Sequence, residues 1–113
     1  MIRNIQEIKT LFNDLGCQVF INHTTQKTSV DIPFIIIVEQ ESNNFIADNQ
    51  VYEDICDYLV VVYCADYYNK QSDIELVENI KTILKNNHIP YEKQVPEWDE
   101  KNLLYKIAFE IYQ

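Results

Sequence analysis

The side chains that could carry out nucleophilic or general acid–base chemistry are few and scattered. The sequence contains two histidines, His23 and His88, and three cysteines, Cys17, Cys56 and Cys64. A cysteine nucleophile needs a neighbouring base, and a zinc site needs Cys and His ligands at short spacings. None of the five residues has such a spacing. We therefore expect no enzymatic activity and no cofactor, and Cys17 is the weak candidate for a nucleophile.

Four carboxylates lie close together in the chain, at Asp48, Glu53, Asp54 and Asp57. Oxygen-rich clusters can bind calcium or magnesium, but a calcium loop needs alternating ligands, a glycine at its sharp turn and a late glutamate. This stretch contains no glycine, and its acids fall on both faces of an expected strand. We interpret the acids as a solvated or subunit-facing surface and predict no metal site. Catalysis by paired carboxylates would need a shared cleft, which the sequence does not indicate.

The middle of the chain is strongly acidic. Residues 31–78 contain eleven acids and one base, Lys70, a net charge of −10 compared with −9 for the whole chain. Because Lys and Arg contacts to phosphates dominate affinity for nucleic acids, we expect no specific nucleic-acid binding. No apolar run is long enough to span a membrane, and the amphipathic N-terminal segment lacks the apolar centre of a signal peptide. We therefore also expect an intracellular protein without a membrane partner.

Two segments have the apolar spacing of amphipathic helices, and the 113 residues fit a single domain over residues 1–113. The first segment spans residues 2–15 and is followed by Gly16, which suits a left-handed cap. The second begins at Ser72, which with Glu75 forms a capping-box pair, and ends near Asn87. Its apolar stripe comprises Ile74, Val77, Ile80, Ile83 and Leu84.

Alternating or continuous apolar residues predict strands over 17–21, 32–38, 51–55, 58–65, 91–95 and 102–112. The segments 51–55 and 58–65 can also form one long strand with a bulge near Cys56 and Asp57. In the last segment the alternation places one set of side chains on one face: Leu103, Tyr105, Ile107, Phe109 and Ile111. Prolines at positions 90 and 96 flank the 91–95 segment, which is typical of an edge strand. We predict an α+β fold in the order α-β-β-β-α-β-β, with two helices packed on one face of an antiparallel sheet of four to five strands.

The strand predicted over residues 32–38 is apolar on both faces. One face can join the core of the domain, and the other needs a second helix or a neighbouring subunit. We predict that Ile35 and Ile37 belong to a subunit interface. The eight tyrosines fit the same interpretation, because tyrosine is enriched at protein interfaces.

The order of motifs over residues 32–112 resembles small tail-completion or tail-terminator proteins of long-tailed phages and prophages of Gram-positive bacteria. In those proteins a Pro-aromatic-apolar strand leads into an N-F-x-A-D-N turn, a V-Y pair and an apolar strand. An acidic capped helix, an I-x-Y-E-K element and an alternating strand follow. The matching residues here are Asn44, Phe45, Ala47, Asp48, Asn49, Val51, Tyr52, Tyr91, Glu92 and Lys93.

The resemblance implies a non-enzymatic structural protein that forms a homo-oligomeric ring, commonly of six subunits, between the tail tube and the head–tail connector proteins. It would act in the host cytoplasm during assembly and then reside in the virion tail or neck. The acidic segment would then be a flap that contacts a neighbouring subunit or tail component through Phe45, Asp48, Asn49 and Tyr52. Glu53, Asp54 and Asp57 would face the channel and repel passing DNA.

An alternative function fits the same composition. The acidic surface could belong to a cytosolic regulatory binding module that captures a basic partner, for example an inhibitor that mimics DNA. The absence of catalytic spacings is compatible with both functions, and the neighbouring genes would distinguish them.

Overall fold

The computed structural model describes residues 4–22, 31–39 and 58–112. These residues form an α+β fold with a mixed sheet and two helices, which confirms the predicted fold class. The elements along the chain are α1 (Ile5–Leu11), the 3-10 turn η1 (Asn13–Leu15), β1 (Gln18–Ile21), β2 (Phe34–Glu39), β3 (Tyr58–Cys64), α2 (Gln71–Asn86), β4 (Tyr91–Lys93), β5 (Glu97–Asp99) and β6 (Leu104–Ile111).

The six strands are arranged in the order β1-β2-β3-β6-β4, with β5 also paired to β6. β1 and β2 run parallel, with Gln18 opposite Phe34, and the other pairs are antiparallel. The prediction of a purely antiparallel sheet of four to five strands was therefore wrong. A parallel pair needs a crossover of roughly a dozen residues, and the chain between β1 and β2 has that length.

Helix α1 begins with a reciprocal cap and is followed by the 3-10 turn η1, which ends at a glycine. The Asn4 side chain accepts a hydrogen bond from the Glu7 N–H at 2.9 Å, and the Glu7 carboxylate accepts one from the Asn4 N–H at 3.0 Å. After η1, Gly16 adopts φ 79°, a left-handed conformation that glycine reaches without steric cost. The helix, the left-handed Gly16 and the following strand agree with the sequence prediction, but the α-helix itself ends at Leu11 and a 3-10 turn fills the interval to Gly16.

Helix α2 starts at Gln71, and its N-cap Lys70 makes no side-chain cap bond. The predicted capping box at Ser72 and Glu75 was therefore wrong, because Ser72 already lies inside the first turn of the helix. The polar contact at this end comes from Asp73, whose Oδ2 accepts the Asp66 N–H at 2.9 Å. Asp73 is 1% exposed, and its Oδ1 has no hydrogen-bond partner among the described residues.

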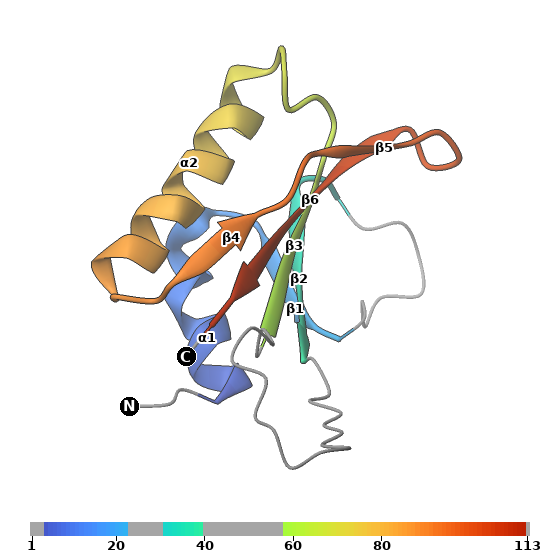
Figure 1. Cartoon of the computed structure of the whole chain (residues 1–113). Coiled ribbons are helices and arrows are strands. Elements are labelled where there is room, and N and C mark those ends of the chain that lie inside the picture. Colours follow the sequence, from blue (N-terminus) through green and yellow to red (C-terminus); the bar gives the residue numbers. More distant parts are fainter. Residues whose placement is uncertain (1–3, 23–30, 40–57, 113) are drawn as a thin grey trace, which may run out of the picture.

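Both helices pack against the same face of the sheet (Figure 1), and alternate residues of the central strands meet them there. The core cluster combines Ile8 and Phe12 of α1 with Val77, Ile80 and Leu84 of α2. From the sheet it takes Ile35, Ile37, Val60, Val62, Cys64, Ile107, Phe109 and Ile111. In the described part of the chain, no helix is long and apolar enough to cross a membrane.

The C-terminal third of the chain contains one strand that the sequence prediction missed. β4 is a short edge strand as predicted, but β5 adds a second short strand against the N-terminal half of β6. Tyr105, Ile107, Phe109 and Ile111 face the helices as predicted. Leu103 does not continue their row, because it precedes β6 in a turn with φ 54° and is 69% exposed.

Candidate functional site: a groove on the outer face of the sheet

The face of the sheet that points away from α1 and α2, here called the outer face, is also apolar. On β2 it carries Phe34, Ile36 and Val38, and the strand register places Val61 opposite Ile36 and Leu59 opposite Val38. Ile35 and Ile37, which the sequence analysis assigned to a subunit interface, have no exposed surface and lie in the core. Any subunit contact through this strand would therefore use the alternate residues on the outer face.

One end of the outer face is closed by aromatic packing. The rings of Phe34 and Tyr63 stack with centroids 4.8 Å apart, and Phe20 of β1 meets Phe34 edge-on at 6.2 Å. Phe20 and Phe34 are both at most 9% exposed. Offset-stacked and edge-to-face pairs stabilise such clusters beyond the burial of area, so aromatic contacts add to the stability of this end of the sheet.

Next to this cluster the outer face contains a groove of about 500 Å³. Its floor is formed by Val38 and Leu59 together with Val61 and Ala108, and Tyr63 forms a wall. The connection from β4 to β5 forms the opposite side, with Gln94, Val95 and Glu97. Pockets of about 300–1,000 Å³ with apolar floors and a few polar groups are typical binding sites, so this groove is the candidate functional site.

The polar groups of the groove come from β6 and the β4–β5 connection. Lys106 lies directly opposite Glu97 in the strand register, although no ion pair joins them. On β6 two positions beyond Ala108, the Glu110 carboxylate accepts hydrogen bonds from Gln94 Nε2 at 2.9 Å and from the Tyr112 hydroxyl at 3.0 Å. The backbone N–H of Gln94 also donates to the Ala108 carbonyl at 2.8 Å. These bonds fix the β4–β5 connection against the sheet, so one side of the groove is held in place.

The two described cysteines lie away from this groove, on the core side. Burial raises the pKa of the Cys17 thiol, and burial together with the charges of Asp73 and Asp66 raises that of Cys64 to about 12. A raised pKa keeps each thiol protonated at neutral pH, and the thiolate is the nucleophilic form. The weak catalytic candidate Cys17 therefore gains no activation from its surroundings.

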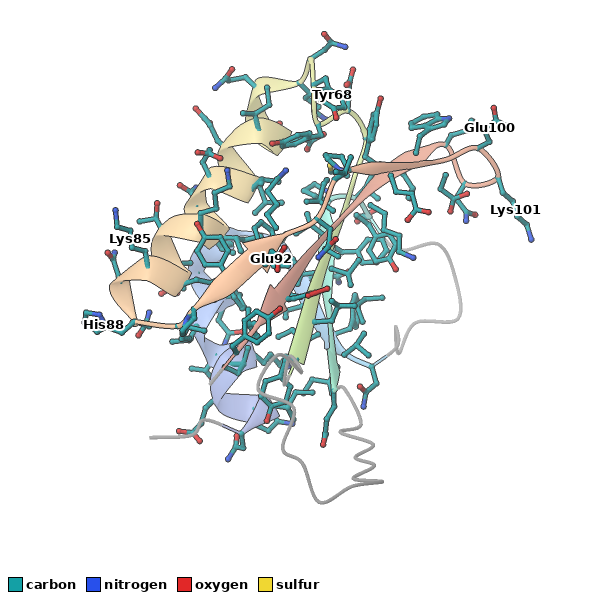
Figure 2. The ribbon with its side chains drawn as sticks, in the orientation of Figure 1. Tyr68, Lys85, His88, Glu92, Glu100 and Lys101 are labelled. Carbon is teal, nitrogen blue, oxygen red and sulfur yellow. The ribbon has the colours of Figure 1, made fainter. Side chains whose placement is uncertain are left out.

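The histidines give no further chemistry in the described residues. His88 is exposed beyond the end of α2 (Figure 2), has φ 56° and is not among the residues that line the groove. Among residues 4–22, 31–39 and 58–112, no group of three His, Cys, Asp or Glu side chains could hold a metal ion. His23 and Cys56 lie outside the described residues. So do the predicted interface residues Phe45, Asp48, Asn49 and Tyr52 and the predicted channel residues Glu53, Asp54 and Asp57.

The described residues of the resembling motif are Tyr91, Glu92 and Lys93, which form β4. Tyr91 packs edge-on against Phe109 with ring centroids 5.9 Å apart. Lys93 Nζ lies 5.1 Å from the centre of the Tyr67 ring, a cation–π distance. Glu92 is exposed. Two of the three residues thus attach the edge strand to the core, which is a structural use of this motif.

Comparisons of the chain with known protein families, with curated proteins and with solved structures find no match. The groove residues were not singled out by sequence reasoning. The available signal was the apolar character of both faces of the 32–38 strand, which indicated a second buried surface but not which residues form it.

Proposed function

We propose that this chain is a non-enzymatic structural subunit of a phage or prophage virion, of the tail-completion or tail-terminator type, which assembles as a ring at the head–tail junction. The phage assignment is supported by the order of motifs over residues 32–112. The observation that carries the assembly function is the second apolar face of the sheet, with its groove.

An apolar outer face is costly for a chain that remains alone in water. Val38, Leu59 and Tyr63 are only partly buried, and they lie side by side around one groove. Contiguous exposed apolar surface of this kind marks protein interfaces, where it is covered by another chain. The polar rim formed by Glu97 and Lys106 supports the same function, because interfaces combine an apolar centre with a charged edge.

The chemistry of the described side chains also supports a structural role. The thiols of Cys17 and Cys64 both have raised pKa values, and His88 is exposed and does not line the groove. The groove itself combines an apolar floor with the polar side chains of Gln94, Glu97 and Lys106, and the Gln94 amide is already hydrogen-bonded to Glu110. Such a site suits the burial of a partner's side chains better than the activation of a reacting group.

The test is deletion of the gene in the phage or prophage that carries it. We expect heads and tails that fail to join in electron micrographs and a loss of infectious particles, both restored by the wild-type chain supplied in trans. The Ala108→Trp variant, which fills the groove, should fail to restore joining. The Ile32→Ser variant changes an exposed side chain outside the groove and should restore it. An unchanged titre after deletion would overturn the proposal.

The neighbouring genes distinguish this function from the acidic regulatory module. Flanking capsid, connector and major tail genes support virion assembly. A neighbouring nuclease or repressor gene, together with inhibition of that protein by the purified chain, would favour a DNA-mimic inhibitor instead.

A further inference from the structure

The hairpin formed by β5, the start of β6 and the turn between them, residues 97–106 and here called the arm, extends beyond the rest of the sheet (Figure 1). Its base is braced by aromatic side chains on the helix side. Trp98 packs on its cross-strand partner Tyr105 with ring centroids 4.9 Å apart, and Tyr105 meets Tyr68 at 5.4 Å. Cross-strand aromatic pairs stabilise a two-stranded ribbon, so the arm is a defined projection.

The turn at the end of the arm is held by one carboxylate. Asp99 Oδ1 accepts the backbone N–H groups of Lys101 at 3.0 Å and Asn102 at 3.2 Å, and Asp99 Oδ2 accepts Asn102 Nδ2 at 2.8 Å. These bonds lower the pKa of Asp99, the Asn102 side chain having the largest effect. Glu100 and Lys101 project from the end of the arm (Figure 2). The turn is thus fixed before any partner arrives.

This turn exposes a leucine to water and holds its backbone in an unfavourable conformation. Leu103 has φ 54°, a left-handed conformation that costs free energy for a residue with a Cβ, and 69% of its surface is exposed. Backbone strain of this kind persists where the surrounding structure imposes it, and it clusters at functional sites. A fixed turn that exposes a strained leucine is a candidate contact for another chain.

The groove and the turn at the end of the arm are complementary and do not meet within one copy. Glu97 and Lys106, at the base of the arm, form part of the rim of the groove, whereas the turn residues 100–103 lie outside its lining. The groove volume of about 500 Å³ is ample for a leucine side chain. The turn carries an acid and a base, Glu100 and Lys101, and the rim carries a base and an acid, Lys106 and Glu97. Opposite charges can therefore pair on both sides of the inserted leucine.

We propose that Leu103 on the arm of one copy inserts into the groove of the next copy. The proposal rests on the proposed function, for which it names the contact between subunits. Each copy then uses its arm once and its groove once. Such a head-to-tail contact produces a ring when the rotation between copies closes, and it produces a filament when it does not.

The test measures the mass of the full chain by sedimentation at concentrations up to about 1 mM, which detects contacts as weak as a Kd of that order. We expect the wild type to self-associate and the Leu103→Asp variant to associate at least about 30-fold more weakly, as for a central interface residue. Leu103 is exposed, so this change leaves the fold intact. The Ile32→Ser variant removes another exposed apolar side chain, at 41% exposure, that belongs to neither the groove nor the arm, and it should associate like the wild type.

A mixture of two defective variants tests the direction of the contact. Leu103→Asp retains a normal groove, and Ala108→Trp, checked for folding by circular dichroism, retains a normal arm. The mixture has one compatible arm–groove junction, so we expect heterodimers that cannot grow further. A Leu103→Asp variant that associates like the wild type, or a wild type that stays monomeric at about 1 mM, would overturn the arm–groove contact. Neither result affects the deletion phenotype, which judges the proposed function separately.

Discussion

The two faces of β2 predict that alanine substitutions at two neighbouring isoleucines lower the stability of the protein by different amounts. Ile37 is completely buried in the core, opposite Val60 on β3 and Ile21 on β1. Ile36 is partly exposed on the outer face, opposite Val61. The substitutions Ile37→Ala and Ile36→Ala remove the same atoms from the same strand, so the two variants serve as controls for each other.

Truncation of a fully buried isoleucine to alanine costs about 2–5 kcal/mol, because apolar burial is lost and a cavity is left among residues that relax only in part. We expect about 3–4 kcal/mol for Ile37→Ala. For Ile36→Ala we expect about 1–2 kcal/mol, because part of its surface is already in contact with water and the outer face can adjust. The free energy of unfolding should therefore differ between the two variants by about 2 kcal/mol.

Urea denaturation measures this difference. With a slope of about 2 kcal/mol per M for a domain of this size, the midpoint should fall by roughly 1.5–2 M for Ile37→Ala and by less than about 1 M for Ile36→Ala. The slope itself should not change. Equal losses, or a larger loss for Ile36→Ala, would refute the assignment of Ile37 to the core and restore it to the outer surface.

Three further predictions concern single features of the fold. Gly16→Ala should lower the free energy of unfolding by about 1–2 kcal/mol through backbone conformation alone, since an added Cβ meets no atom within 4 Å. Asparagine tolerates this conformation, so Gly16→Asn should lose less free energy of unfolding in the same urea assay. Equal stabilities of the two variants would contradict the explanation. In a Cys17→Ser, Cys56→Ser background the Cys64 thiol, with a pKa of about 12 compared with 9.0, should contain roughly a thousand-fold less thiolate and react with a thiol reagent at pH 8 only after denaturation. Because the folded state holds the Cys64 proton more tightly, the stability linked to Cys64 is complete below the pKa of the unfolded thiol and is lost as the pH rises towards about 12. Rapid labelling of Cys64 in the native protein would contradict the raised pKa. The pKa of the Asp99 carboxyl, measured by NMR, should lie below the usual range of aspartate, and Asn102→Ala should raise it. The stabilisation linked to Asp99 is present above the pKa of the unfolded state and is lost as the pH falls through the pKa of the folded state. An unchanged titration in Asn102→Ala would exclude the Asn102 contact as the cause of the lowered pKa.

The elements that could be predicted from the sequence are those with a single apolar face. In α2 the spacing of Val77, Ile80 and Leu84 defines one stripe, and all three residues lie in the core. In β6 the row from Tyr105 to Ile111 faces the helices as its alternation predicts. In both elements only one face is apolar, so the spacing of the apolar residues shows which face is buried.

On β2 this agreement fails, because every residue from Phe34 to Val38 is apolar. A strand that is apolar on both faces has no alternation in hydrophobicity, so the sequence cannot show which set faces the helices. The interface was therefore predicted at Ile35 and Ile37, whereas the structure buries them and leaves Ile36 and Val38 on the outer face. At Leu103 the sequence predicted a side chain on the buried face and the structure exposes it, because the apolar alternation begins one residue before the strand does.

The groove could not be predicted because its parts are distant in sequence. Val38, Leu59 and Ala108 come from three strands, and only the pairing of β3 with both β2 and β6 brings them together. The parallel pairing of β1 and β2 and the short strand β5 likewise depend on the path of the chain. Local patterns do not determine these tertiary relations.

The position of β6 in the sheet has a consequence for how the protein forms on the ribosome. β6 pairs with β3, β4 and β5, and it contributes Ile107, Phe109 and Ile111 to the core. β3 leaves the exit tunnel well before β6, and about forty residues separate these two strands, a sequence separation that slows folding. Until Leu104–Ile111 has emerged, the nascent chain has one edge of β3 unpaired, since only β2 is available to pair with it, and the apolar side of α2 lacks its full partner. Cotranslational protection of those surfaces, by the ribosome or by a chaperone, should therefore influence the yield of folded subunits.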